Sequence, residues 1–363
     1  MEENVSLEKL KKLLETELPG YLYHYTNRDS FIGIMKNKEF WVSHIRFMND
    51  IEEERLAENE LLNLLSIPKN KIPSIDMEIL KNETIESIKN EMSKREIFIL
   101  SLSESPDELN MWRGYGKNTP AYSIQIDCDK MIEQFIFQPP TNTIIKNPEV
   151  YKIVDVINKD KIDESIFSPS DGKRKIYYSK CIYDKNEHQQ LIEEIINDSK
   201  DRLKCLGKPF SEKNLSEEIA KRFIFYSPLI KNENFESEKE WRFVIFLENS
   251  FTPEDSKEEL EEELETQTCK YLKSKIKQEI SQFDENANAF LVNKHLIEFR
   301  MGNSFIIPYH KFKFNTNCIA KVTIGACPDS KSVEESTKYF LRQIGFKNAD
   351  SIVELSKIPY RPW

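Results

Sequence analysis

The segment from Glu238 to Leu247 combines a strictly apolar face with a charged one, and this limits the structures that it can adopt. A strand has a period of two, so alternate side chains point to opposite faces. The even-numbered face begins with Glu238, Glu240 and Arg242 and then becomes apolar, whereas the odd-numbered side chains after Lys239 are all apolar: Trp241, Phe243, Ile245 and Leu247. Burying a charged side chain without a partner of opposite charge costs several kcal/mol. We therefore predict that the N-terminal end of this strand leaves the core and presents two carboxylates and a guanidinium at a functional site.

A second predicted strand near the start of the chain carries polar groups on the face that would otherwise be apolar. In the segment 21–26, Leu22, His24 and Thr26 share one face, and three tyrosines share the other. A histidine in this position is often a hydrogen-bonded core residue. In the sequence Tyr-His-Tyr-Thr we expect His24 to bind a ligand instead.

Composition narrows the class of protein. The 52 basic and 62 acidic residues give a net charge of −10, so no overall positive field attracts nucleic acid. No apolar run reaches the ~20 residues that span a bilayer, and we expect a cytoplasmic protein without membrane contact. The nine glycines form neither G-x-G-x-x-G nor a P-loop, which excludes both nucleotide motifs. The six cysteines show no paired spacing, so we predict neither a disulfide framework nor a structural zinc site. No metal cofactor is predicted for the leading interpretation.

Strand and helix patterns are mixed without a regular βαβ alternation. This favours an α+β fold with mixed, mainly antiparallel sheets flanked by helices. We predict one domain over 1–363, with an N-terminal helix within 1–19, an irregular insertion at about 137–172 and a charged helical insertion at about 250–287. Strands are expected at 21–26, 40–43, 97–102, 122–127, 290–292, 296–300, 305–308 and 319–324, and helices at 76–94, 187–206, 212–225 and 332–345.

Several short motifs occur in a fixed order along the chain. They are Tyr23-His24-Tyr25-Thr26; Phe47-Met48-Asn49-Asp50 with Glu53; Ser101-Leu102-Ser103-Glu104 with Asp107 and Met111-Trp112; Phe235 with Glu238-Lys239-Glu240-Trp241-Arg242; Ile324-Gly325; and Ile358-Pro359-Tyr360-Arg361. Together, from about residue 20 to residue 361, they resemble a bacterial family, the domain-of-unknown-function family numbered 2971.

The opening strand, the following helix and Phe40-Trp41-Val42-Ser43 are also similar to the ADP-ribosyltransferase fold of DarT-like toxins. This resemblance implies an ADP-ribosyltransferase-like core with helical insertions and NAD as the substrate. It implies that Glu240 is the catalytic carboxylate with Glu238 beside it, because a carboxylate stabilises the positive charge that develops on the ribose. The residues expected to contact NAD are His24, Tyr25, Thr26, Ser43, Trp112, Tyr115, Arg242, Arg300 and Arg361, with Trp41 as a further aromatic candidate.

The expected activity is ADP-ribose transfer to a macromolecule, nucleic acid or protein, or hydrolysis of NAD. The resemblance suggests a bacterial toxin or anti-phage effector, with a regulatory partner protein as an open possibility. One alternative is a metal-dependent nuclease that uses Asn49, Asp50 and Glu53 together with Glu238 and Glu240. Another is a nucleotide-sensing module of a defence system that performs no catalysis.

Each of these sites also has a structural interpretation. Asn49 or Asp50 could begin a helix, with Glu53 completing a capping box. The carboxylates of Glu238 and Glu240 could pair with Arg242 or Lys239 at an exposed strand end.

Overall fold

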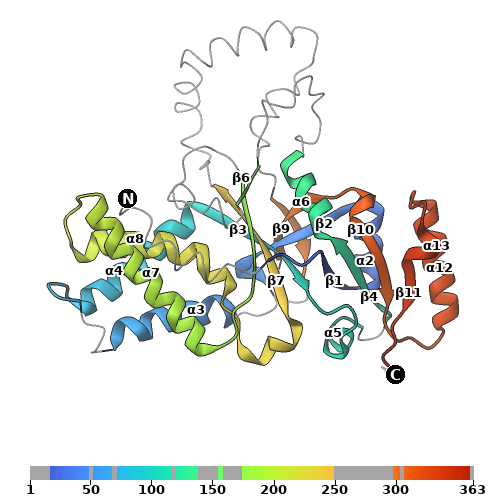
Figure 1. Ribbon diagram of the computed structural model, residues 1–363, viewed down its shortest axis with the longest axis horizontal. Helices are drawn as coiled ribbons and strands as arrows, with labels where there is room; N and C mark the ends of the chain where they lie inside the picture. Colours follow the sequence, from blue (N-terminus) through green and yellow to red (C-terminus); the bar gives the residue numbers. More distant parts are fainter. Residues whose placement is uncertain are drawn as a thin grey trace, which may run out of the picture.

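The computed structural model describes residues 17–48, 52–67, 72–116, 119–137, 154–157, 174–248, 297–302 and 306–359. These residues form a mixed α+β structure in which helices flank a mostly antiparallel sheet, as predicted (Figure 1). The strands are β1 (Tyr21–Asn27), β2 (Glu39–His44), β3 (Arg95–Ser103), β4 (Ala121–Asp127), β5 (Val154–Ile157), β6 (Arg174–Lys180), β7 (Glu240–Glu248), β8 (Glu298–Met301), β9 (Ile306–Lys313), β10 (Ile319–Ile324) and β11 (Val353–Leu355).

The α-helices cover both faces of the sheet. They are α2 (Arg28–Asn37), α3 (Glu52–Ser66), α4 (Met77–Ser93), α5 (Leu109–Tyr115), α6 (Cys128–Phe137), α7 (Lys185–Cys205), α8 (Glu212–Tyr226), α12 (Ser330–Gln343) and α13 (Ala349–Ile352). Helices α3, α4, α7 and α8 pack against one face in a first apolar core, and α2, α6, α12 and α13 pack against the other face in a second core. The short 3₁₀ helices are η1 (Ile45–Phe47), η6 (Ser227–Leu229), η7 (Glu233–Glu238) and η9 (Thr316–Cys318). None of the helices in the described ranges is long and apolar enough to cross a membrane.

The sheet divides into two branches at β3. Strand β7 pairs with β3 along its whole length, from Arg95 to Ser103. The opposite edge of β3 is shared, because β1 pairs with it at Ser103 and β2 pairs with it at Phe98 and Ile99. Strands β4, β10 and β11 continue the branch that begins with β1, and β9 and β8 continue the branch that begins with β2.

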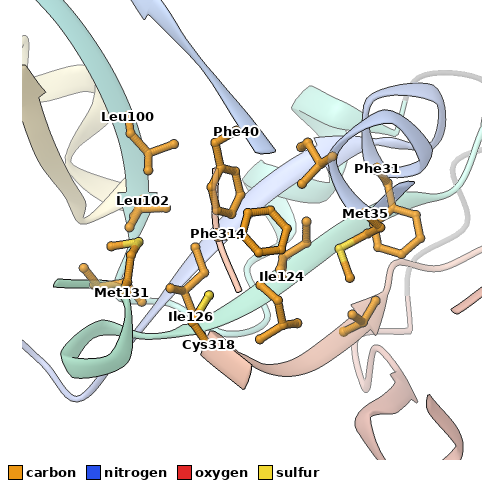
Figure 2. Close-up of a cluster of buried hydrophobic side chains, with 14 of the residues drawn as sticks. Phe31, Met35, Phe40, Leu100, Leu102, Ile124, Ile126, Met131, Phe314 and Cys318 are labelled. Carbon is orange, nitrogen blue, oxygen red and sulfur yellow. The ribbon is translucent and has the colours of Figure 1, made fainter. Parts of the chain in front are cut away.

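Aromatic side chains fill the space between the branches. Phe40 of β2 and Phe314, just after β9, lie with ring centroids 4.8 Å apart. Figure 2 shows this pair in the middle of the second core, between Leu100 and Leu102 on one side and the side chains of α2 on the other. Burying side chains of this size contributes about 1.5–3 kcal/mol each to folding. The region where β1 and β2 separate from β3, which we call the fork, is therefore part of the packed core.

Strand β7 has two buried faces. Trp241, Phe243 and Ile245 belong to the second core, as the alternation predicted. Val244 and Phe246 belong to the first core on the other side of the sheet. The charged residues at the start of this strand therefore lie at the edge of the first core and not beyond it, and the prediction that the strand leaves the core was wrong.

Four further expectations are covered only in part, or not at all, by the described residues. The N-terminal helix lies outside the described residues except for 17–19, which are not helical. The insertion at 137–172 was expected to be irregular, but it contains β5, which pairs in parallel with β6. The charged insertion at about 250–287 and the predicted strand at 290–292 lie outside the described residues.

Candidate functional site

The start of β7 carries a cluster of four paired charges. We refer to Lys231, Glu238, Glu240 and Arg242 as the carboxylate cluster. Arg242 Nε donates to Glu240 Oε1 at 2.9 Å, and Arg242 Nη2 donates to Glu240 Oε2 at 3.3 Å. Lys231 Nζ bridges the two carboxylates, with Glu238 Oε2 at 2.6 Å and Glu240 Oε2 on its other side. The two cations and two carboxylates compensate one another within the cluster.

Glu240 and Arg242 are deeply buried, with 4% and 1% of their surfaces exposed. Burial would raise the pKa of Glu240, but the charges and hydrogen bonds of Arg242 and Lys231 outweigh it and lower the pKa to about 2. Glu240 is therefore ionised at neutral pH. Its backbone N–H is also satisfied, because it donates to the Tyr183 hydroxyl at 2.8 Å.

Glu238 does not belong to the strand. It ends η7, and the next residue, Lys239, adopts a left-handed conformation with φ of 44° before β7 begins at Glu240. We expected Glu238 to continue the even-numbered face of the strand, and this expectation was wrong because the turn at Lys239 separates Glu238 from β7. The turn nevertheless directs Glu238 back to Lys231, so the two carboxylates meet through a shared cation. The side chain of Glu238 is 31% exposed and is the more accessible of the two.

Serines on the neighbouring strands surround the buried charges. Ser101 of β3 and Ser179 of β6 lie opposite Arg242, and Ser103 lies opposite Glu240. Side chains of this size leave room for a guanidinium between strands. Ser103 Oγ also donates to the carbonyl of Glu238 at 2.6 Å, which fixes the end of η7.

Helix α5 lies beside the cluster and contributes Tyr115. Asn110 of this helix donates to Ser237 Oγ of η7 at 3.3 Å. Tyr115 as a whole residue is 40% exposed. Burial and the charges of Glu238 and Glu240 raise the pKa of Tyr115 to about 12. The hydroxyl therefore stays protonated and can donate a hydrogen bond.

His24 lies on the other face of the sheet. Tyr23 is opposite Ser103, which is opposite Glu240, so these three residues share one face and the adjacent His24 points to the opposite one. Its Nδ1 donates to the carbonyl of Ser101 at 3.2 Å, and its ring meets the edge of Phe40 at 5.2 Å. Burial lowers its pKa to about 4, so the imidazole is neutral at pH 7.

The structure therefore does not bring His24 and Glu240 together as the resemblance to ADP-ribosyltransferases implied. His24 occupies the fork, where the carbonyl of Ser101 faces the point at which β1 and β2 separate. Thr26 is buried on the same face as His24.

Tyr25 and Trp112 pack against each other under α5. The rings meet edge to face at 4.9 Å. Tyr25 donates to the carbonyl of Ser105 at 2.8 Å and accepts from Glu108 N at 3.1 Å. Trp112 is 2% exposed. Both were predicted to contact a ligand, but in this structure their polar atoms are used to fix the segment between β3 and α5.

Asp107 ties this segment to the C-terminal strand region. Its Oδ1 accepts from Trp112 Nε1 and from Ser356 Oγ, both at 2.6 Å, and its Oδ2 accepts from Lys357 N at 2.9 Å. Gly325 lies against the Trp112 indole, so three segments that are far apart in the sequence, 107–112, 325 and 356–357, meet at one carboxylate and one indole. We refer to Asp107, Trp112, Gly325 and Ser356 as the indole latch.

One comparison with known proteins gives a match. Residues 111–243 match the family model described as Protein of unknown function (DUF2971). This confirms the resemblance to that family over these residues. No curated protein and no solved structure matches the chain. The DUF2971 match includes the whole carboxylate cluster. Of the indole latch it includes only Trp112, because Asp107, Gly325 and Ser356 lie outside residues 111–243.

Ser43 and Arg300 meet on the second branch of the sheet. Arg300 Nη2 of β8 donates to Ser43 Oγ of β2 at 2.9 Å. Trp41, on the same face of β2, stacks on Tyr309 with centroids 4.6 Å apart and remains 41% exposed. These residues lie apart from the carboxylate cluster, since Ser43 is opposite Ile99, and Ile99 is opposite Val244 near the middle of β7.

Three predicted positions cannot be placed. Asn49, Asp50 and Arg361 lie outside the described residues. Glu53 lies in the first turn of α3, but its side chain is not described. Among the described residues, no group of three or more His, Cys, Asp or Glu side chains is arranged to hold a metal ion.

The sequence did not reveal the role of Lys231 or of Tyr183. Lys231 follows the apolar residues Leu229 and Ile230 and has no spacing relation to the carboxylates that would identify it. A buried lysine requires a counter-ion, so the two unexplained carboxylates downstream were one signal. The small side chains of Ser101 and Ser103 within an otherwise apolar strand were a second hint that large polar groups lie opposite them.

Proposed function

We propose that the chain binds NAD at the carboxylate cluster and cleaves the bond between nicotinamide and ribose. The observation that carries the proposal is the pair of carboxylates held by Lys231, in which Glu240 is buried and fixed and Glu238 is partly exposed. Cleavage of this bond builds positive charge on the ribose, and a fixed carboxylate in a region of low dielectric stabilises such a charge. NAD itself comes from the resemblance to ADP-ribosyltransferases.

The two carboxylates have different parts in this proposal. Both oxygens of Glu240 are engaged by Arg242 and Lys231, so Glu240 keeps the cluster in place. Glu238 is partly exposed and only its Oε2 contacts Lys231, which makes it the carboxylate that faces a ligand. Tyr115 supplies an aromatic ring beside it. His24, on the opposite face, has no part in this proposal.

The reaction is balanced without a metal or a redox partner. The bond between C1′ and the pyridinium nitrogen breaks, and nicotinamide leaves as a neutral molecule with the bonding electron pair. Water or a nucleophile of a macromolecule attacks C1′, and Glu238 accepts the proton that it loses. Transfer and hydrolysis share these steps. A role as a toxin or anti-phage effector is part of the same proposal and follows from the resemblance alone.

The test is incubation of the protein with adenylate-labelled NAD, with and without DNA, RNA and cell lysate. Labelled ADP-ribose, free or attached to a macromolecule, is the expected product. Glu238→Gln is the informative variant, because this residue is partly exposed and its replacement leaves Lys231 paired with Glu240. We expect a loss of about 10²-fold or more. Glu236→Gln, an exposed change in the same 3₁₀ helix, is the matched control and should retain activity.

Intact NAD in every reaction, without a shift in melting temperature on addition of NAD, would overturn the proposal.

One observation favours a second candidate, a nucleotide-sensing module. The two oxygens of Glu240 are already saturated by cations, which suits a binding site as well as a catalytic one. This candidate predicts a melting shift with NAD or another nucleotide, no turnover, and an effect of Glu238→Gln on affinity alone.

The nuclease alternative has less support from the cluster. The ammonium of Lys231 lies between Glu238 and Glu240, where a divalent ion would have to bind. Displacing a buried, doubly paired lysine would be costly.

A further inference from the structure

Arg300 carries a positive charge without a counter-ion among the described residues. Among the described residues, its hydrogen-bond partner is the neutral hydroxyl of Ser43, at 2.9 Å, and its buried Nε has none. Burial lowers the pKa of this guanidinium, and among the described residues the charge that opposes the shift is that of Tyr309 and not of a carboxylate. A half-buried guanidinium in this situation destabilises the protein, so an anionic partner from outside the chain would compensate for it.

The neighbouring carboxylates are already occupied. Glu298 accepts from the Tyr309 hydroxyl at 2.8 Å and pairs with Lys311 at 2.7 Å. Glu39 accepts from Trp41 Nε1 at 3.0 Å and lies 4.0 Å from the same lysine. Lys311 is therefore shared by two carboxylates, and Arg300 is the cation of this face that remains available.

An exposed aromatic surface lies next to this cation. The Trp41 indole stacks on Tyr309 through one face, at 4.6 Å and 28° between the rings, and 41% of the residue is exposed. Tyr309 itself is 4% exposed and makes a rigid support. Arg300 reaches Ser43 from β8 across β9, which carries Tyr309, so the guanidinium and the indole flank the same tyrosine.

We propose that Trp41 and Arg300 form a second binding site, for a nucleoside phosphate, in which the base stacks on the free face of the indole and a phosphate binds the guanidinium. Indole faces stack on nucleobases, and the planar guanidinium matches the geometry of phosphate oxygens. A mononucleotide fits better than a nucleic acid strand, because a strand needs several unpaired basic residues along its backbone and the described part of this face offers Arg300 alone.

The site is distinct from the carboxylate cluster and does not rest on the proposed function. It lies on the branch formed by β2, β9 and β8, whereas the cluster lies on β7 beside α5. A protein that left NAD intact would still bind a nucleoside phosphate here. Binding at this face and cleavage at Glu238 are therefore measured separately.

The experiment is isothermal titration of the full-length protein with ADP as the probe, and with adenosine and inorganic phosphate as half-ligands. ADP should bind at least about tenfold more tightly than either half-ligand, since stacking and the charged contact are then combined. Arg300→Met and Trp41→Leu should each weaken ADP binding about tenfold or more. Lys36→Gln removes an exposed positive charge elsewhere and should leave the affinity unchanged.

Stability provides a second readout. Arg300→Met removes an uncompensated charge and keeps an unbranched side chain that can replace the aliphatic part of arginine, so the melting temperature of the ligand-free protein should stay the same or rise. Trp41→Leu keeps apolar contact with Tyr309 and provides an independent test of the same site. The inference is overturned if the parent protein does not bind ADP at millimolar concentration, if both variants bind it as the parent does, or if a single-stranded oligonucleotide binds while ADP does not.

Discussion

Gly325 makes room for the indole of Trp112. A Cβ atom at position 325 would lie 2.8 Å from Cε3 of this indole and 3.3 Å from the carbonyl oxygen of Ala121. The same carbonyl accepts the Gly325 N–H at 2.9 Å, so the backbone cannot move away without losing a hydrogen bond. The motif residues Ile324-Gly325 and Met111-Trp112 are therefore explained by one contact in the indole latch.

This contact predicts the effect of Gly325→Ala. The added methyl group would overlap the indole, and overpacking of this kind costs about 1–3 kcal/mol. Urea unfolding should show that loss of stability. Gly33→Ala is the matched control, because nothing lies within 4 Å of a Cβ at position 33 of α2. This variant should be as stable as the parent or more stable by up to about 1 kcal/mol. Equal stability of the Gly325→Ala protein and the parent would contradict the proposed packing.

A second prediction concerns the buried charge at Glu240. Glu240→Gln removes the carboxylate that pairs with both Arg242 and Lys231 and should destabilise the fold by about 3–5 kcal/mol at pH 7. Glu236→Gln, at an exposed position nearby, should have little effect.

The same variant predicts a pH dependence with a definite sign. The pKa of Glu240 is lowered from 4.5 to about 2 in the folded protein, so its contribution is complete above pH 4.5 and is lost as the pH falls toward 2. The difference in unfolding free energy between the parent and Glu240→Gln should shrink over this range. A difference that stays constant between pH 6 and pH 3 would show that Glu240 is not held ionised by the cluster.

The Asp107 carboxylate of the indole latch gives a third prediction. It accepts three hydrogen bonds, from Trp112, Ser356 and Lys357. In Asp107→Asn the amide nitrogen would face donors and leave one of them unpaired, at a cost of about 1–3 kcal/mol. Amide hydrogen exchange should become faster in α5 and in residues 353–359. Asp129→Asn, an exposed change of the same chemistry, should leave the exchange unchanged, and slow exchange in both variants would argue against the latch.

Local sequence patterns predicted most of the fold. The alternation in β1, β3, β4 and β7 identified strands close to their observed bounds, because strand faces in a two-layered core repeat every second residue. The fork of the sheet at β3 could not be predicted. The fork depends on whether β1 or β2 pairs with each part of one edge of β3. A single sequence contains no local pattern that identifies the pairing partner of a strand.

The candidate site was also predicted only in part from the sequence. Glu240 and Arg242 were identified because charged residues interrupted an apolar strand. The sequence suggested an exposed end, and the structure buries it, because Lys231 supplies the missing counter-charge from a position nine residues earlier. His24 was assigned to the same site. Its neighbour Tyr23 shares a face of the sheet with Glu240, so His24 lies on the other face. Strand alternation placed His24 and the tyrosines of β1 on opposite faces. Which of these faces lies on the same side of the sheet as Glu240 depends on the register of β1 and β7 against β3, and this register was not predicted.

A last prediction concerns His24 at the fork. Burial lowers its pKa from 6.5 to about 4, so the folded protein keeps the imidazole neutral where the unfolded chain would protonate it. As the pH falls from 6.5 to 4 the unfolded state binds the extra proton, and stability decreases. In His24→Leu this contribution disappears, together with the hydrogen bond from Nδ1 to the carbonyl of Ser101. The variant should be less stable than the parent at pH 7, and the gap should narrow as the pH is lowered toward 4. NMR spectra of the ring protons give a direct check, since the His24 signals should not titrate between pH 7 and pH 5. A midpoint near 6.5 would mean that the ring is solvated and available to a ligand, which would return His24 to the list of binding residues.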